Sequence, residues 1–269
     1  MEAPQTRRQW SGGTAVIITG GASGLGRAAA LAFAAAAGQH SRLPRPLVVV
    51  VADIDMAGGQ ETCAMAIERG ADGALFVETD VADEGSVAHL ADEAADRFFD
   101  TVVYALINAG VEGTRAATDA YPTDEFDRVM AVNVRGSWLT LKHLLPLLEA
   151  SPRSRGAAVV TSSTAGLAGM AEFGPYCASK HALLGLVRSA AREYAGRVRI
   201  NAVCPATTDT PMVARFEEQW PDWQAATNAS YPMGRIARPQ EVADAMLWLC
   251  TGATFTTGSH IVIDGGAGA

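Results

Sequence analysis

The feature of this sequence that most constrains its fold is a repeated alternation of short apolar runs with longer Ala- and Leu-rich stretches. Residues 48–51, for example, are four valines in a row. A strand with one solvated face alternates apolar and polar side chains, so an unbroken apolar run indicates a strand buried on both faces, as in parallel sheets covered by helices. Such strands are predicted at residues 15–19, 47–52, 74–78, 102–108, 157–162, 197–203 and 261–263.

Helical stretches lie between these runs, at residues 25–37, 56–69, 84–98, 123–150, 174–195 and 239–250. This order predicts one doubly wound Rossmann-type α/β domain, with a parallel seven-stranded sheet and helices on both faces. We expect the domain at residues 14–266, after an N-terminal tail at 1–13. The long connection at 207–237 carries aromatic residues and prolines, and we expect it to form a helical lid over a substrate site.

Composition argues against several classes of protein. With 21 Lys and Arg against 29 Asp and Glu, the net charge of −8 disfavours a nucleic-acid or anionic membrane surface. No apolar run approaches the roughly 20 residues that span a bilayer. The four cysteines form no Cys-x-x-Cys pair and the histidines are scattered, so neither a disulfide framework nor a metal site is predicted. Residues 1–10 lack the apolar core of a secretory signal, and we expect a cytoplasmic protein.

A glycine-rich turn links the first predicted strand to the first predicted helix, in the sequence TAVIITGGASGLG at residues 14–26. Gly20, Gly24 and Gly26 lack a Cβ, which allows the backbone to approach a ligand closely. Amide groups at the start of a helix stabilise a pyrophosphate. The spacing G-x-x-x-G-x-G differs from the commonest dinucleotide fingerprint, so a turn without a ligand stays the alternative.

Asp53 ends the second predicted strand. An acidic residue there can accept hydrogen bonds from both hydroxyls of an adenosine ribose and repels a 2′-phosphate. Ser23 in the glycine turn carries no positive charge that would neutralise such a phosphate. The residue types therefore favour NAD over NADP. The alternative is that Asp53 is a solvated acid or caps the next helix, a role for which Asp55 is also available.

Tyr176 and Lys180 stand four residues apart at the start of a predicted helix, in the sequence GPYCASK. This spacing places both side chains on one helical face. A free phenol, with a pKa of about 10, is a poor base at neutral pH. A neighbouring ammonium favours the phenolate and lowers that pKa, so the pair could exchange protons with a substrate. A chance pair on the surface is the alternative.

In this order the motifs resemble those of the short-chain dehydrogenases/reductases, over residues 14 to 266. The segment at 19–26 resembles the family's cofactor loop, Asn-Ala-Gly at 108–110 its segment after the fourth strand, and residues 233–243 and 257–266 its C-terminal signatures. Two positions depart from the family pattern: Ile107 replaces an asparagine, and Ala206 replaces the glycine after Pro205. Because alanine resists positive φ, the second change puts the geometry around Thr210 in question.

The resemblance implies hydride exchange between NAD and a secondary alcohol or ketone. Tyr176 would be the general acid/base, and Lys180 would lower its pKa and bind the nicotinamide ribose. Ser163 would hydrogen-bond the substrate oxygen, and Asn133 would hold a water next to the lysine. The cofactor-binding residues that the resemblance implies are Gly20, Ser23, Gly24, Leu25, Gly26, Asp53, Asp80, Val81, Asn108, Ala109, Gly110, Tyr176, Lys180, Pro205, Thr208 and Thr210.

The expected substrate pocket is mostly apolar, with Arg215 as its one expected cation; its other residues are Glu112, Thr164, Leu167, Met170, Phe173, Cys177 and the segment 212–231. This lining favours an apolar, possibly alicyclic, small alcohol or ketone over a phosphate, CoA or dicarboxylate ligand. Three other functions stay open: an NADPH-dependent ketone or 3-oxoacyl-carrier-protein reductase, a non-redox isomerase or cyclase, and a catalytically silent dinucleotide-binding regulator. The intact Ser163, Tyr176 and Lys180 argue against the last.

The two longest predicted helices, at 123–150 and 174–195, are those with which the resembled family packs its subunits. The first is crowded with leucines at positions 139, 141, 144, 145, 147 and 148. That is more apolar surface than one face of a domain is expected to need. A homo-oligomer, tetramer or dimer, is therefore predicted.

Overall fold

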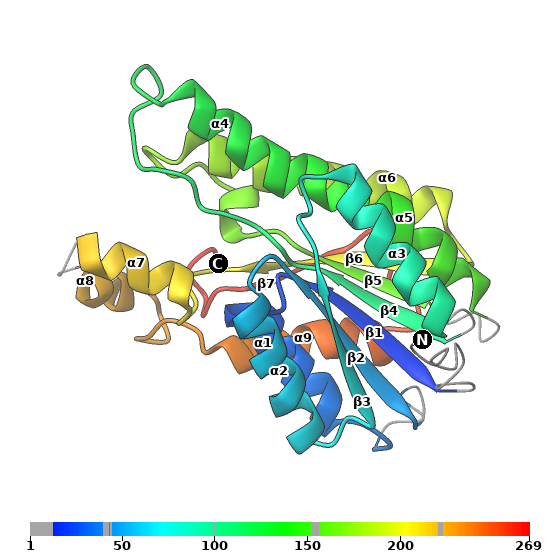
Figure 1. Ribbon diagram of the computed structural model, residues 1–269. Coiled ribbons are helices and arrows are strands. Elements are labelled where there is room, and N and C mark those ends of the chain that lie inside the picture. The colour runs from blue at the N-terminus through cyan, green and yellow to red at the C-terminus, as the bar shows by residue number, and fades with distance from the viewer. Residues whose placement is uncertain (1–12, 40–42, 44, 99–100, 152–155, 220–222) are drawn as a thin grey trace.

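The computed structural model describes residues 13–39, 43, 45–98, 101–151, 156–219 and 223–269. Residues 1–12 of the predicted N-terminal tail lie outside the described residues. Seven parallel strands form one sheet in the order β3-β2-β1-β4-β5-β6-β7 (Figure 1). Their bounds, within two residues of the predicted ones, are β1 Thr14–Thr19, β2 Leu47–Asp53, β3 Gly73–Glu78, β4 Val102–Ile107, β5 Gly156–Thr161, β6 Val198–Pro205 and β7 His260–Ile263.

Helices cover both faces of this sheet, as Figure 1 shows. One face carries α1 Gly24–Ala35, α2 Met56–Glu68 and α9 Pro239–Thr251. The other carries α3 Glu84–Phe98, α4 Thr123–Val129, α5 Ser137–Ala150 and α6 Gly174–Glu193. Within the described residues, no helix is long and apolar enough to cross a membrane. The predicted doubly wound α/β architecture is confirmed.

Alternate residues of each central strand belong to two separate hydrophobic clusters, one on each face of the sheet. In β1, Ile17 faces the cluster beneath α3, α5 and α6, whereas Val16 and Ile18 face the cluster beneath α1 and α9. All three side chains are fully buried. Burial on both faces is the physical reason that these strands are apolar throughout.

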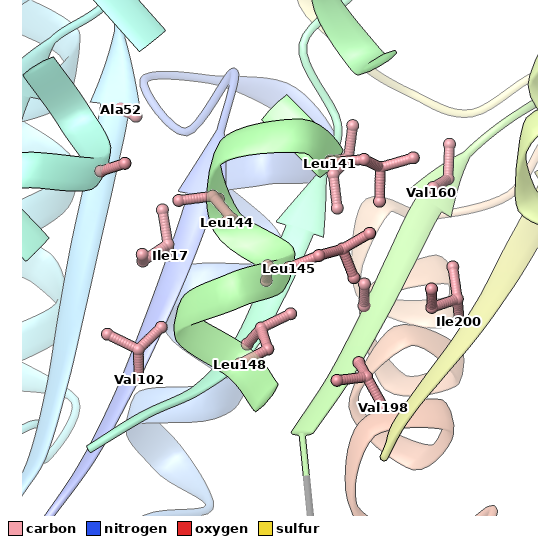
Figure 2. Packing of buried hydrophobic residues seen from close by; sticks show 14 of the residues in the cluster. Ile17, Ala52, Val102, Leu141, Leu144, Leu145, Leu148, Val160, Val198 and Ile200 are labelled. Atoms are coloured by element: carbon pink, nitrogen blue, oxygen red, sulfur yellow. The ribbon is translucent and has the colours of Figure 1, made fainter. Parts of the chain in front are cut away.

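The leucines of α5 fill the first of these clusters. Leu141, Leu144, Leu145 and Leu148 repeat with helical spacing and point onto the strands, where Figure 2 shows them beside residues such as Val160. Leu139 is buried as well, and Leu147 packs against the same cluster. The protein's own core takes up these leucines, with Leu139 packed against Val81 and Val87, so they give no support for an oligomer. The oligomeric state itself stays a prediction.

The predicted helix at 123–150 is divided into three parts. A wider π-helical segment, Met130–Gly136, separates α4 from α5. Gly136 lies close to the chain after β3, since a Cβ there would be 2.9 Å from Val81 Cγ2 and 3.0 Å from the carbonyl oxygen of Val81. In the predicted lid region, α7 Pro211–Gln219 and α8 Trp223–Ser230 are both helical. Whether they close over a substrate stays a prediction.

Arg199 of β6 holds the C-terminal end of α9 to the sheet. Its guanidinium donates hydrogen bonds to the carbonyl oxygens of Leu249, Cys250 and Ala253, at 2.5, 2.6 and 2.8 Å. The carbonyls of Leu249 and Cys250 have no partner within α9, so the arginine satisfies groups at the helix end, while that of Ala253 also accepts from the amide of Thr256.

Arg199→Met should therefore lower the free energy of unfolding by about 2 kcal/mol, because it leaves the carbonyls of Leu249 and Cys250 without their donor. Thermal and urea denaturation measure the change. Arg197→Met is the matched control: that side chain is about half exposed and pairs with Glu149, so its loss should cost less than about 1 kcal/mol. Equal losses in the two variants would contradict the assignment.

Candidate active site

A cavity of about 990 Å³ lies at the carboxyl edge of the sheet, where β1, β4, β5 and β6 end. Ligands of open α/β sheets bind at this edge. The cavity gathers nearly all the site residues predicted from the sequence: Gly20, Ser23, Gly24, Leu25, Asp53, Asp80, Val81, Asn108, Ala109, Gly110, Ser163, Tyr176, Lys180, Pro205, Thr208 and Thr210. Of the predicted catalytic and cofactor-binding residues, Gly26 and Asn133 do not line it.

The turn between β1 and α1 requires glycine, because a Cβ at Gly20 or Gly26 would collide with neighbouring backbone atoms. Gly20 has a φ of 66°, and a Cβ there would lie 2.8 Å from the Cα of Ala109. A Cβ on Gly26 would lie 2.0 Å from the carbonyl oxygen of Gly20, so this glycine packs α1 against the turn and does not contact the cavity. Ser23 precedes α1 without capping it through its side chain. The first amide groups of the helix are therefore available to an anion in the cavity.

Asp53 ends β2 with its carboxylate beside the glycine turn. Its Oδ2 accepts a hydrogen bond from the amide of Ala22 at 2.9 Å, and its Oδ1 accepts one from the amide of Asp55 at 3.1 Å. Asp55, not Asp53, caps α2, through Oδ1 and the amide of Gly58. Each Asp53 oxygen keeps acceptor capacity, because a carboxylate offers about four lone-pair sites. Asp55 therefore caps α2, whereas Asp53 lines the cavity.

Asn108 ties three strand ends together directly beneath the cavity. Its Nδ2 donates to the carbonyl oxygens of Thr19 and Gly20, both at 3.2 Å, and its Oδ1 accepts from the hydroxyl of Thr161 at 3.1 Å. Ile107, the departure from the family pattern, is buried in the core. The substitution therefore adds apolar packing and removes no group from the cavity.

The segment after β6 approaches the glycine turn from the other side. A Cβ on Gly24 would lie 3.5 Å from Thr210, so the two stretches are in contact. Thr208 is buried, and its hydroxyl donates to the carbonyl of Ala206 at 3.0 Å. Among the described residues, Glu172 is the one non-glycine residue with a positive φ. Ala206 therefore occupies ordinary backbone space, and its alanine causes no strain.

Ser163, Tyr176 and Lys180 meet where β5 ends and α6 begins. The Lys180 Nζ lies 5.5 Å from the centre of the Tyr176 ring and donates to the carbonyl oxygen of Thr161 at 2.9 Å. The Ser163 hydroxyl accepts from the amide of Ala165 at 3.1 Å and hydrogen-bonds the tyrosine side chain. The i, i+4 spacing in α6 thus places both titratable groups on the cavity face, as predicted.

Burial dominates the titration of both groups. Desolvation raises the pKa of Tyr176 to about 12, with Ser163 opposing the rise and the negative charge of Glu112 adding to it. Desolvation also lowers the pKa of Lys180 to about 8. In the protein alone, loss of hydration thus sets the pKa of Tyr176 above its ordinary value, and the expected lowering by Lys180 stays a prediction. In this state the phenol is protonated at neutral pH.

Asn133, in the π-helical segment, is fully buried and works as a clamp. Its Oδ1 accepts from the amide of Val111 at 2.8 Å, and its Nδ2 donates to the carbonyl of Val111 and the hydroxyl of Ser179, at 2.9 and 3.0 Å. The side chain joins the loop after β4 to α6. A Cβ on Gly110 would lie 3.2 Å from Asn133 Oδ1 and 3.5 Å from Lys180 Nζ. That this asparagine holds a water stays a prediction.

The substrate end of the cavity contains more charge than the sequence suggested. Arg115 and Arg128 line it together with the predicted Arg215, and Glu172 joins the predicted Glu112. Each arginine is paired with a glutamate: Arg115 with Glu172, Arg128 with Glu125, and Arg215 with Glu112. Of the predicted lining residues, Leu167 and Cys177 do not line the cavity, and Cys177 is buried. The two additional arginines carry no motif, so no sequence signal could have found them.

The chain matches the family model described as enoyl-(acyl carrier protein) reductase over residues 20–268. Short-chain dehydrogenase RED2 of Pyricularia oryzae is 38% identical, over 94% of this chain and 96% of its own length. The chain belongs to the short-chain dehydrogenases/reductases. Another member of this family, cis-4-hydroxycyclohexanecarboxylate dehydrogenase of Sinomonas cyclohexanicum, is 37% identical over 93% of this chain and 94% of its own.

Among solved structures, levodione reductase has the same fold, with a TM-score of 0.84 and 30% identity over 94% of this chain and 96% of its own. The α/β fold is therefore shared over nearly the whole chain. This short-chain dehydrogenase/reductase is an oxidoreductase that interconverts alcohol and carbonyl groups with a nicotinamide cofactor.

Proposed function

We propose that this protein is an NAD(H)-dependent dehydrogenase that interconverts a secondary alcohol and a ketone on a small, mostly apolar and alicyclic molecule. The observation that carries the proposal is the meeting of Ser163, Tyr176 and Lys180 in one cavity with the glycine turn and Asp53. A proton-transfer group thus shares its space with a phosphate-binding helix start and a ribose-binding acid.

Residues from four strand ends would hold the cofactor. The uncapped start of α1 and the Cβ-free Gly20 and Gly24 suit a pyrophosphate. Asp53, with unused acceptor capacity on both oxygens, suits the two adenosine ribose hydroxyls. Asp80 and Val81 would flank the adenine, and Pro205, Thr208 and Thr210 the nicotinamide carboxamide. When bound, NAD(H) accepts or supplies the hydride.

Tyr176 takes the proton from the alcohol hydroxyl during oxidation and returns it to the carbonyl oxygen during reduction. Ser163 donates a hydrogen bond to the same oxygen and stabilises the charge that develops there. The ammonium of Lys180 lies over the tyrosine ring and favours the phenolate. A substrate that displaces water from the cavity strengthens these interactions, because they then act in a lower dielectric.

The substrate class follows from the remaining lining. Outside the residues assigned to the cofactor, the cavity lining includes the apolar side chains of Val111, Val132, Met170, Phe173 and Met212. The relative from Sinomonas cyclohexanicum is named for a hydroxylated cyclohexane acid, and levodione reductase for a dione. An alicyclic ring that carries an oxidisable hydroxyl fits this lining.

Tyr176→Phe should reduce turnover of cyclohexanol with NAD⁺ by about a thousandfold, since it removes the proton acceptor and leaves the ring. Affinity for NADH, followed by nicotinamide fluorescence, should stay within about threefold, because the phenol contributes little to ground-state binding of the cofactor. Tyr121→Phe is the control, since that hydroxyl contacts the amide of Thr114 and does not line the cavity. Substantial turnover by Tyr176→Phe would refute the assignment.

Asp53→Asn should weaken NADH binding about tenfold and reduce the preference for NADH over NADPH, because it removes the charge that binds the ribose and repels a 2′-phosphate. Paired titrations of both cofactors measure the two effects. Asp55→Asn, at the cap of α2, should change stability slightly and the cofactor preference not at all. Tighter binding of NADPH than NADH by the unmodified protein would overturn the choice of NAD.

Glu112→Gln should shift the pH dependence of alcohol oxidation to lower pH. The negative charge of Glu112 helps to raise the pKa of Tyr176, so its removal lets the phenolate form at lower pH. The pH profile of kcat/KM with NAD⁺ measures the shift, and the limb that rises with pH is the informative part. Glu93→Gln is the control, since this glutamate pairs with Arg97 and neither residue lines the cavity. A profile that stays in place, or moves to higher pH, would be inconsistent with this geometry.

A further inference from the structure

Glu112 is a carboxylate held in the wall of the substrate cavity. It follows β4, two residues after Gly110, and the chain turns away at Gly113, whose φ is 77°. Its side chain is 17% exposed, less than those of Glu125 and Glu172, at 22% and 40%. A carboxylate so far from solvent needs compensation for the hydration it has lost.

Arg215 of α7 supplies only part of that compensation. Its Nε and Nη2 both lie 2.8 Å from the same oxygen of Glu112, Oε1. Oε2 has no hydrogen-bond partner in the described part of the chain. It is also not one of the fully buried oxygens, which would be closed off from any ligand. Since Glu112 lines the cavity, this oxygen is open to the cavity's contents.

The pair of Glu125 and Arg128 shows what complete compensation looks like. There the arginine donates from Nε to Oε2 at 2.8 Å and from Nη2 to Oε1 at 2.6 Å, so each carboxylate oxygen has a partner. Glu112 differs because its second oxygen is left for something else. A carboxylate oxygen can only accept, so a group that fills the position must donate a hydrogen bond.

The surrounding charges define that donor further. Glu112 interacts electrostatically with Arg128 as well as with Arg215, so its negative charge is already balanced by guanidinium groups. A cationic ligand group would be repelled by the two arginines, and an anionic one by the carboxylate. A neutral hydroxyl satisfies both conditions. Glu112 and Tyr176 line the same cavity, so a molecule bound at the tyrosine shares its space with the carboxylate.

We propose that Glu112 Oε2 accepts a hydrogen bond from a second hydroxyl of the substrate, while Arg215 holds the carboxylate in place. The enzyme then selects alicyclic diols, and the hydroxyketones formed from them, over simple alcohols. This inference rests on the proposed function, because it assumes that the first hydroxyl is oxidised at Tyr176. Glu112 and Arg215, which are 103 residues apart, together determine specificity and bring α7 to the substrate.

The test compares cyclohexanol with the 1,2-, 1,3- and 1,4-cyclohexanediols at saturating NAD⁺. At least one diol should exceed cyclohexanol in kcat/KM about tenfold or more, the range of one hydrogen bond to a charged group. Because the quantity is a ratio, effects of Glu112 on the tyrosine pKa that are common to both substrates cancel. The preferred isomer reports where the second hydroxyl lies.

In Glu112→Leu the preference should fall to about twofold, the statistical advantage of having two hydroxyls, and in Glu112→Gln it should fall part of the way. Arg215→Met should also reduce the preference, because the carboxylate loses its anchor. Glu93→Gln is the matched control and should keep the preference of the unmodified protein, since neither this glutamate nor its partner Arg97 lines the cavity. Circular dichroism verifies folding of every variant, and the Gln variant provides the test if the Leu variant does not fold.

A diol preference that survives in both Glu112 variants would overturn the inference. So would the absence of any diol preference in the unmodified protein, or faster oxidation of cis-4-hydroxycyclohexanecarboxylate than of every diol. In each of these cases alcohol oxidation itself is observed, and the proposed function stands. Oxidation of none of these alcohols, with either NAD⁺ or NADP⁺, would overturn the proposed function, and the inference would fall with it.

Discussion

The parallel pairing of strands that are buried on both faces is the constraint on which the rest of this structure depends. Each central strand contributes side chains to two cores, so it has no face left for polar groups. The polar residues that line the cavity lie where strands end. Because parallel strands end at the same edge, Asp53, Asn108 and Ser163 come together although they are far apart in the sequence. The active site thus follows from the way in which the core is built.

At that edge, burial sets the chemistry of the proton-transfer groups. Tyr176 and Lys180 both titrate away from their ordinary values, each toward its neutral form, because each has lost hydration. A buried lysine with a lowered pKa and a buried tyrosine with a raised one are poised to respond to any new charge in the cavity. A positively charged nicotinamide, or the loss of the charge on Glu112, would favour the phenolate. This sensitivity fits a group that must both take and give a proton.

Sequence patterns predicted the fold and most of the cavity because they are local. An apolar run predicts a doubly buried strand, and a strand–glycine–helix sequence predicts a phosphate loop, within one short window each. The same local patterns misled in three places. The leucines of α5 indicated a surface for another subunit, yet the protein's own core takes them up. Gly26 was expected to contact the cofactor, yet it packs α1 against the turn, and a continuous helix was expected where Asn133 lies in a π-helical segment.

The sequence by itself determined the seven strands, the cofactor loop and the spacing of Tyr176 and Lys180, because each depends on residues within a few positions of one another. Only the tertiary structure decided which side chains from distant segments meet. It paired Arg215 with Glu112, brought Arg115 and Arg128 to the substrate end, and left one carboxylate oxygen without a protein partner among the described residues. Burial, and with it the direction of each pKa shift, likewise depends on the whole packed domain, because hydration is lost only when distant elements close around a group.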